Sequence, residues 1–100
     1  MSKNKYLISK HAIKDLNDIW LYTYQRWSIE QADRYYELLI GEIEFIAENY
    51  QTGKSLEQTR KNYRVSKIKS HLIFYRKSET GLVEIIRILH QRMDVKNKFE

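Results

Sequence analysis

The sequence has no cysteine and only three histidines, and these shortages exclude several kinds of site. Without cysteine, neither a disulfide framework nor a thiolate metal site is available. His11, His71 and His90 are too scattered along the chain to predict a ligand-spaced metal cluster. We therefore expect no metal and no cofactor. Function should then depend on binding surfaces or on acid–base groups.

Long apolar runs are also missing. No stretch approaches the roughly 20 apolar residues needed to span a bilayer, and the apolar run after residues 1–5 is too short for a signal peptide. The sequence thus predicts a soluble, cytoplasmic protein that does not bind membranes. At 42% hydrophobic and 13% aromatic residues it is too apolar for a disordered chain. Its 100 residues predict a single domain, residues 1–100.

Charge is divided unevenly along the chain. Residues 1–50 hold six Lys and Arg against eight Asp and Glu, a net charge of −2, whereas residues 51–100 hold twelve against five, a net charge of +7. A basic half suits an anionic partner such as RNA, DNA or an acidic protein, because its field attracts such partners. A solvated basic surface without a partner is the alternative.

The first half of the chain predicts two helices. Ser9 is placed to cap a first helix that ends near Trp27. Ser28 and Gln31 occupy the N-cap and N3 positions of a capping box, which opens a second helix running to about Tyr50. The link between them is only a residue or two, so the helices should form an antiparallel hairpin.

Each helix has an apolar seam at helical spacing, and we expect both seams in the core. The first seam consists of Ile13, Leu16, Trp20, Tyr24 and Trp27. The second consists of Ile29, Ala32, Tyr36, Leu39, Ile43, Ile46 and Tyr50. Trp20 and Trp27 are therefore expected to be core residues rather than interface anchors. Tyr35 and Phe45 fall off the second seam, which indicates that this helix also contacts the sheet.

Consecutive strands are predicted in the second half. Gly53 follows the second helix, and a polar linker continues to about Asn62. The strands are expected at about 62–68, 70–77 and 82–90, with turns at Lys69-Ser70 and Ser78–Gly81. With residues 5–9 as a short first strand, the order is strand, two helices, three strands. This order predicts a two-layer α+β domain in which a helical hairpin packs on a small antiparallel sheet.

The last two strands are almost wholly apolar, which is typical of a sheet covered on both faces. A chain of this length rarely covers both, so we expect one face to be built for a partner. His71 and Tyr75 are four positions apart in a strand and should share a face with Ile73. His71 is expected to be a hydrogen-bonded core or rim residue, and Tyr75 to be a packing residue.

Two groups of residues suggest polar chemistry. Five cations lie within ten residues around the first of these strands, a density suited to phosphates or carboxylates: Arg60, Lys61, Arg64, Lys67 and Lys69. An exposed edge strand protected by lysines is the alternative. At the end of the last strand, His90, Arg92 and Asp94 place a base, a cation and a carboxylate close together.

A ribonuclease reaction could use these groups. His90 would be the base that deprotonates a 2′-hydroxyl, with Arg64, Arg87 and Arg92 as cations on the phosphate. No tyrosine or histidine after Arg92 completes the set as a general acid. The alternative is a strand end whose polar groups anchor the tail or bind a protein.

Three segments of the chain resemble the ParE toxins of the RelE/ParE superfamily, in order and over nearly the whole length. They are AIKDLNDIWLYTYQRWSIEQADRYYELL, YRVSKIKSHLIFYR and VEIIRILHQRMD. The run from Asp15 to Tyr22 is similar to the ParE first helix, and the run from Arg87 to Asp94 to its C-terminal signature. The resemblance implies the toxin of a type II toxin-antitoxin module, inhibited by a ParD-like antitoxin whose C-terminal segment folds onto the toxin.

The resemblance further implies that DNA gyrase is the target, so that DNA is contacted only indirectly, through gyrase or the antitoxin. RelE relatives instead cleave mRNA on the ribosome, using a catalytic tyrosine or histidine pair near the C-terminus. In this sequence only His90 is a counterpart of that pair. We therefore expect a binding toxin, with ribonuclease activity and a purely regulatory subunit as alternatives. The residues expected to bind the target are Arg64, Arg76, Arg87, His90 and Arg92.

Overall fold

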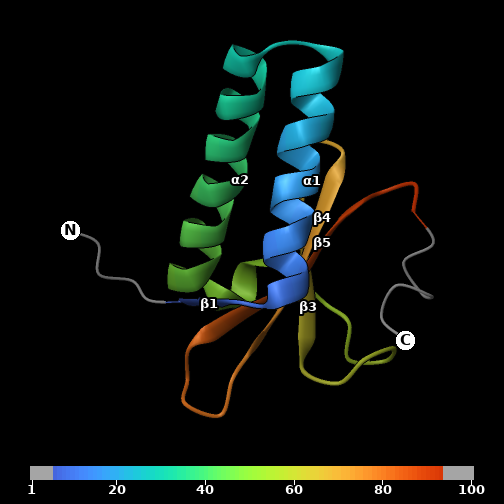
Figure 1. Cartoon of the computed structure of the whole chain (residues 1–100). Helices are drawn as coiled ribbons and strands as arrows, with labels where there is room; N and C mark the ends of the chain where they lie inside the picture. Colours follow the sequence, from blue (N-terminus) through green and yellow to red (C-terminus); the bar gives the residue numbers. More distant parts are fainter. Residues whose placement is uncertain (1–5, 94–100) are drawn as a thin grey trace.

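The computed structural model describes residues 6–93, which form a helical hairpin on a sheet. The elements are β1 (Tyr6–Ile8), α1 (Lys10–Arg26), α2 (Ile29–Glu48), the 3₁₀ turn η1 (Tyr50–Thr52), β2 (Lys54–Ser55), β3 (Tyr63–Ile68), β4 (His71–Lys77) and β5 (Val83–His90). Figure 1 shows the two helices side by side over the sheet, so the predicted two-layer α+β class is confirmed. Neither helix is long and apolar enough to cross a membrane.

Both helices start at the predicted serine caps. The Ser9 hydroxyl accepts a hydrogen bond from the Ala12 amide at 3.0 Å, and the Ser28 hydroxyl accepts one from the Gln31 amide at 3.1 Å. Each bond satisfies an amide that the first helical turn leaves without a partner. The second helix ends at Glu48, two residues earlier than expected, because the chain continues as the turn η1.

The sheet is mixed rather than antiparallel. Its strand order is β1-β5-β4-β3-β2, and β1 pairs with β5 in parallel, with Tyr6 opposite Val83 and Ile8 opposite Ile85. The other neighbours are antiparallel, as expected. Two elements of this arrangement were not predicted: the parallel pairing, which depends on a long-range contact, and β2, which falls in the segment expected to be a linker.

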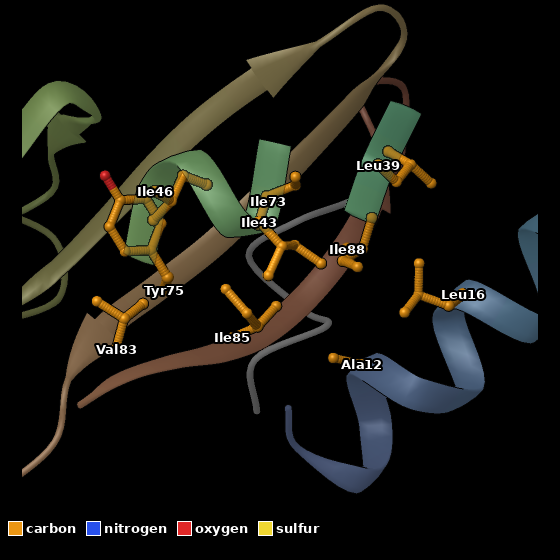
Figure 2. Packing of buried hydrophobic residues seen from close by; sticks show 10 residues of the cluster. All are labelled: Ala12, Leu16, Leu39, Ile43, Ile46, Ile73, Tyr75, Val83, Ile85 and Ile88. Carbon is orange, nitrogen blue, oxygen red and sulfur yellow. The ribbon is translucent and has the colours of Figure 1, made fainter. Parts of the chain in front are cut away.

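The core lies between the helical hairpin and the sheet (Figure 2). Its buried residues are Ala12, Leu16, Leu39, Ile43, Ile46, Ile73, Tyr75, Val83, Ile85 and Ile88. Tyr75 is fully buried, as expected for a packing residue. Its hydroxyl donates to the Tyr50 carbonyl at 2.8 Å and accepts from the Gly53 amide at 2.9 Å, which ties the chain after α2 to the sheet.

The predicted core seam of α1 is wrong except at Leu16. Trp27 is 69% exposed, Ile13 and Tyr24 are also exposed, and Trp20 is only partly buried. The stripe that faces the core instead begins with Ala12 and Leu16. Both stripes have helical spacing, so periodicity alone could not decide which of them contacts the sheet.

The second helix follows its predicted seam more closely. Ala32, Leu39, Ile43 and Ile46 are buried, whereas Ile29 and Tyr36 at its outer side are exposed. The expected contact between α2 and the sheet is present, since Tyr35 packs against the core and reaches β4.

The centre of the sheet offers no open apolar face for a partner. Phe74 and Leu89 alternate with the core residues Ile73 and Ile88, and they are only 4% and 1% exposed. The expectation of one apolar face left open therefore fails at these central positions. The exposed apolar side chains of the described residues lie mainly on the helical hairpin instead.

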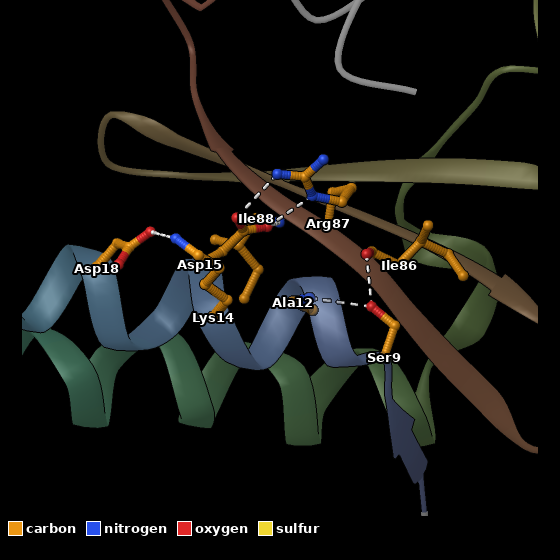
Figure 3. A network of polar contacts seen from close by, with 8 residues as sticks. All are labelled: Ser9, Ala12, Lys14, Asp15, Asp18, Ile86, Arg87 and Ile88. Carbon is orange, nitrogen blue, oxygen red and sulfur yellow. Dashed lines mark hydrogen bonds and ion pairs between the residues drawn. The ribbon is translucent and has the colours of Figure 1, made fainter. Parts of the chain in front are cut away.

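Helix α1 lies along the edge of β5 beyond the end of β1 (Figure 3). Ser9 donates its amide to the Ile85 carbonyl at 3.0 Å and its hydroxyl to the Ile86 carbonyl at 2.8 Å. Asp15 accepts from the Ile88 amide and from two guanidinium nitrogens of Arg87, each at 2.9 Å. These polar side chains complete hydrogen bonds that another strand would otherwise make at this edge.

Candidate functional site

An open groove of about 510 Å³ lies where the second half of α1 meets the start of β4 and the end of β5. Its lining is largely aromatic and apolar, with a few polar groups. The lining residues are Asp18, Ile19, Tyr22, Thr23, Trp27, Gln31, Tyr35, Ser70, His71, His90 and Met93. Trp27 and Tyr22 are 69% and 60% exposed, so large side chains remain in water at the groove.

Secondary structure brings these residues together. Tyr22 lies on the last turns of α1 and Trp27 at its C-terminal end, while Tyr35 comes from α2. His71 and His90 are directly opposite each other in the β4–β5 ladder. The groove thus depends on both helices and on two strands, and it is built from residues between 18 and 93.

The two histidines form a polar centre in the groove. Their rings meet edge to face, with centroids 5.3 Å apart. The Tyr35 hydroxyl and His71 Nδ1 are hydrogen-bonded at 2.7 Å, and His90 Nδ1 accepts from the Arg92 amide at 3.1 Å. The prediction that His71 is a hydrogen-bonded core or rim residue is confirmed.

Burial lowers the pKa of His71 to about 4, and the neighbouring His90 acts in the same direction while Asp15 opposes it. His71 is therefore neutral near pH 7. Burial raises the pKa of Tyr35, against hydrogen bonds to Ser70. A neutral imidazole thus lies beside a protonated phenol, so the Tyr35–His71 pair is polar without a positive charge.

The groove has no metal-binding geometry. Within residues 6–93, no three His, Asp or Glu side chains come close enough to hold a metal ion. The acidic residue at the rim, Asp18, is paired with Lys14 at 2.8 Å. The lining is instead of the kind that protein interfaces favour, because exposed tryptophan and tyrosine supply much of the binding energy in such surfaces.

The family of the chain follows from its relatives. The family described as ParE toxin of type II toxin-antitoxin system, parDE, matches residues 6–95. The chain belongs to the ParE toxin family. It is 46% identical over 92 residues to Toxin ParE1 of Caulobacter vibrioides, covering 91% of this chain and 93% of that one. It is 39% identical over 92 residues to Toxin ParE1 of Mycobacterium tuberculosis, covering 92% and 94%.

A solved structure has the same fold. The chain matches a chain from the structure titled "Chromosomal ParDE TA system from P. aeruginosa" with a TM-score of 0.73, over 89% of this chain and 98% of that chain. Sequence identity in this match is 15%, so it supports the fold alone. Together with the family, it confirms the ParE-like α+β architecture, and the chain is the toxin component of a type II toxin-antitoxin system.

The five residues expected to bind the target of this ParE toxin lie in three places. His90 lines the groove, and Arg92 follows it two residues later with its amide bonded to His90 Nδ1. Arg87 is turned toward α1 and is held by Asp15, with only 17% of its side chain exposed. Arg64 and Arg76 are on the opposite end of the sheet, since Arg64 pairs with Tyr75, four residues and about 13 Å from His71 along β4.

Arg64 and Arg76 each have a local partner. Arg64 donates to the Gly53 carbonyl at 2.6 Å, and its guanidinium lies 5.3 Å from the centre of the Tyr50 ring. Arg76 pairs with Glu84 at 3.2 Å. The structure therefore does not assemble Arg64, Arg87 and His90 into one site, and Asp94 lies outside the described residues.

Sequence reasoning missed most of the groove. Trp27 was assigned to the core, and Tyr22 and Met93 were not singled out. The sequence contained one indication of the groove, because Tyr35 falls off the apolar seam of α2. In the structure Tyr35 lines the groove beside His71. Identifying the others requires knowing which stripe of α1 faces the sheet.

Proposed function

We propose that this ParE toxin inhibits DNA gyrase by binding it, so that replication is blocked, and that a ParD-like antitoxin neutralises the toxin by covering the groove. The proposal places the protein in the cytoplasm, with residues 1–100 acting as one toxin domain. The observation that carries it is the groove itself, whose exposed Trp27 and Tyr22 suit a protein partner rather than a small substrate.

The antitoxin proposal rests on chemistry at the groove. An antitoxin segment that folds on binding would insert apolar side chains between Tyr22 and Trp27. Its polar groups would meet His71 and His90, which are both half-buried, and of which His71 is neutral near pH 7. Binding would remove apolar surface of the toxin from water and so stabilise it.

Binding to the antitoxin should raise the thermal midpoint of the toxin. A partner at 100 times its dissociation constant adds about 2.7 kcal/mol to the free energy of unfolding. Thermal unfolding of the toxin alone and with saturating antitoxin measures this difference, and equal midpoints would contradict the proposal. Trp27→Ala should weaken antitoxin binding by at least about tenfold, as expected for an anchor residue.

A matched control separates the groove from general exposure. Phe45 is also an exposed aromatic residue, on α2, but it does not line the groove. Phe45→Ala should leave antitoxin affinity unchanged in the same titration. Equal losses for Trp27→Ala and Phe45→Ala would mean that the groove is not the antitoxin site.

In this proposal the toxin acts on gyrase. The alternative is that it acts as a ribonuclease. Arg87 is held by Asp15 and His90 Nδ1 accepts a backbone hydrogen bond, so two members of the expected ribonuclease set already have structural partners. This arrangement favours a binding toxin. We propose His90 and Arg92 as target contacts at the groove and retain Arg64, Arg76 and Arg87 as further contacts to be tested.

The deciding experiment runs two assays on the same preparation. When the toxin is added to purified gyrase and its DNA substrate, supercoiling should stop or cleaved DNA should accumulate. Translating ribosomes should keep their mRNA intact. Codon-spaced mRNA cuts with normal supercoiling would overturn the proposal and make His90 a general-base candidate. Growth arrest that survives replacement of His90 and Arg92 would exclude them as target contacts.

A further inference from the structure

The basic segment before and within β3, from Arg60 to Lys69, does not line the groove. Two of the five cations of this segment have different surroundings. Arg64 bonds to the Gly53 carbonyl between η1 and β2, whereas Lys67 is exposed further along β3. Arg60 and Lys61 come just before β3, at the end of the sheet that carries Arg76 and Lys77.

Tyr63 lies among guanidinium groups at this end of the sheet. The centre of its ring is 5.7 Å from Cζ of Arg60 and 6.0 Å from Cζ of Arg76. Arg76 is the direct cross-strand neighbour of Tyr63, and its ion pair with Glu84 holds it across the strands. We call Arg60, Tyr63 and Arg76 the cation–tyrosine cluster. Guanidinium groups packed on a tyrosine ring are of the kind on which a base can stack.

A hollow of about 490 Å³ adjoins this cluster. It is lined by three cations and by neutral groups that can donate hydrogen bonds, with one carboxylate, and Leu7 supplies an apolar wall. The polar lining residues are Lys61, Asn62, Arg76, Lys77, Ser78, Glu79 and Thr80. Ammonium, guanidinium, amide and hydroxyl donors together suit a phosphate oxygen.

We propose that the hollow and the cation–tyrosine cluster bind single-stranded nucleic acid, with a phosphodiester group in the hollow and a base against the cluster. This activity goes beyond gyrase inhibition and does not depend on it. It also replaces the expectation that DNA is contacted only indirectly. Arg76 links the two parts, because it both lines the hollow and lies beside Tyr63.

Charge alone would also suit an acidic peptide, and the cluster decides between the two. Across the hollow and the cluster, Arg76 and Glu84 neutralise each other, which leaves Arg60, Lys61 and Lys77 against Glu79. The Lys77 ammonium also lies 4.8 Å from the centre of the Tyr50 ring. A peptide carboxylate could use only the cations. A nucleotide adds stacking, worth about tenfold in affinity for each base. The arrangement therefore favours a nucleic acid.

The test is fluorescence anisotropy of short labelled single-stranded DNA and RNA, with the full-length toxin and without gyrase, over a range of salt. Lys61→Glu should weaken binding and reduce the magnitude of the salt slope by at least about 0.7, the contribution of one phosphate contact. Arg34→Glu makes the same change in charge on the exposed surface of α2, and it should leave affinity nearly unchanged.

A second pair of variants tests stacking. Tyr63→Leu should lose about tenfold in affinity with little change in salt slope, whereas Tyr63→Phe should bind like the unmodified protein. A preference for RNA over DNA of the same sequence would assign a role to the 2′-hydroxyl, and equal affinity would support backbone and base contacts alone.

Three results would overturn the proposal. The first is no binding at low salt, about 50 mM. The second is equal weakening by Lys61→Glu and Arg34→Glu, which would show only unspecific attraction. The third is equally tight binding of a polyglutamate peptide that is insensitive to Tyr63→Leu, which would assign the surface to an acidic protein. Since gyrase is absent from the assay, none of these results bears on the proposed target.

Discussion

Removing the Asp15 carboxylate should destabilise the fold, although Asp15 does not itself line the groove. Asp15 binds the Arg87 guanidinium through both oxygens and also accepts from the Ile88 amide (Figure 3). Its hydrogen bond raises the pKa of Arg87, so the guanidinium keeps its charge at neutral pH. The perturbation is Asp15→Ala, which leaves a guanidinium and a strand amide without this acceptor.

The size of the effect follows from burial. The side chains of Arg87 and Asp15 are 17% and 11% exposed, between a surface pair and a fully buried one. Breaking a buried pair costs about 3–5 kcal/mol, and exposed pairs contribute about 0–1 kcal/mol. We therefore expect Asp15→Ala to lower the free energy of unfolding by about 2–3 kcal/mol. In a domain of this size that corresponds to a decrease in Tm of about 10–20 °C.

Denaturant and thermal unfolding of purified variants measure this loss. Asp18→Ala is the matched control, because Asp18 lies one turn further along α1 and pairs with the exposed Lys14. That variant should keep the midpoint of the unmodified protein. A double-mutant cycle with Arg87→Met should give a coupling energy of about 1–2 kcal/mol. If Asp15→Ala and Asp18→Ala were equally mild, Arg87 would not be a structural cation, and its proposed role in target binding would gain weight.

Two further predictions concern His71 and the glycines. Because burial holds the pKa of His71 near 4, below the 6.5 of the unfolded chain, the unfolded state binds more protons between these values. Stability should therefore be complete above pH 6.5 and fall by up to about 1.4 kcal/mol per pH unit toward pH 4, and His71→Gln should flatten that part of the urea-unfolding profile. Gly53→Ala should destabilise by about 1–3 kcal/mol, because the added methyl group would overlap the Tyr75 hydroxyl. Gly41→Ala should stabilise by about 1 kcal/mol, because nothing lies within 4 Å of that site in α2, and equal effects of the two changes on Tm would contradict this reasoning.

Local chemistry was readable from the sequence. Ser9 and Ser28 cap their helices because their hydroxyls act within three residues along the chain. The consecutive strands β3, β4 and β5 begin within about a residue of their expected positions. The turns between them lie where expected, and Lys69 and Gly81 adopt positive φ angles there. These features depend on near neighbours, and a single sequence contains that information.

The rest depends on contacts between distant residues. Nothing local indicates that Tyr6–Ile8 will pair in parallel with Val83–Ile85. Nor does the spacing of Ala12 and Leu16 distinguish them from the exposed stripe that contains Trp27. The groove was missed for the same reason, since Tyr35, His71 and His90 meet only after both helices and the last strand have packed.

The position of Ser9 has a consequence for synthesis of the toxin. Its amide and hydroxyl bond to residues 85 and 86, which are synthesised more than 70 residues after it. The first strand and the first helix therefore have no sheet edge to join until β5 has emerged. His90 and Met93, which complete the groove, follow only a few residues later. A nascent chain that has not reached β5 is thus unable to form the groove. A truncated product lacking β5 should therefore be harmless to the cell that makes it.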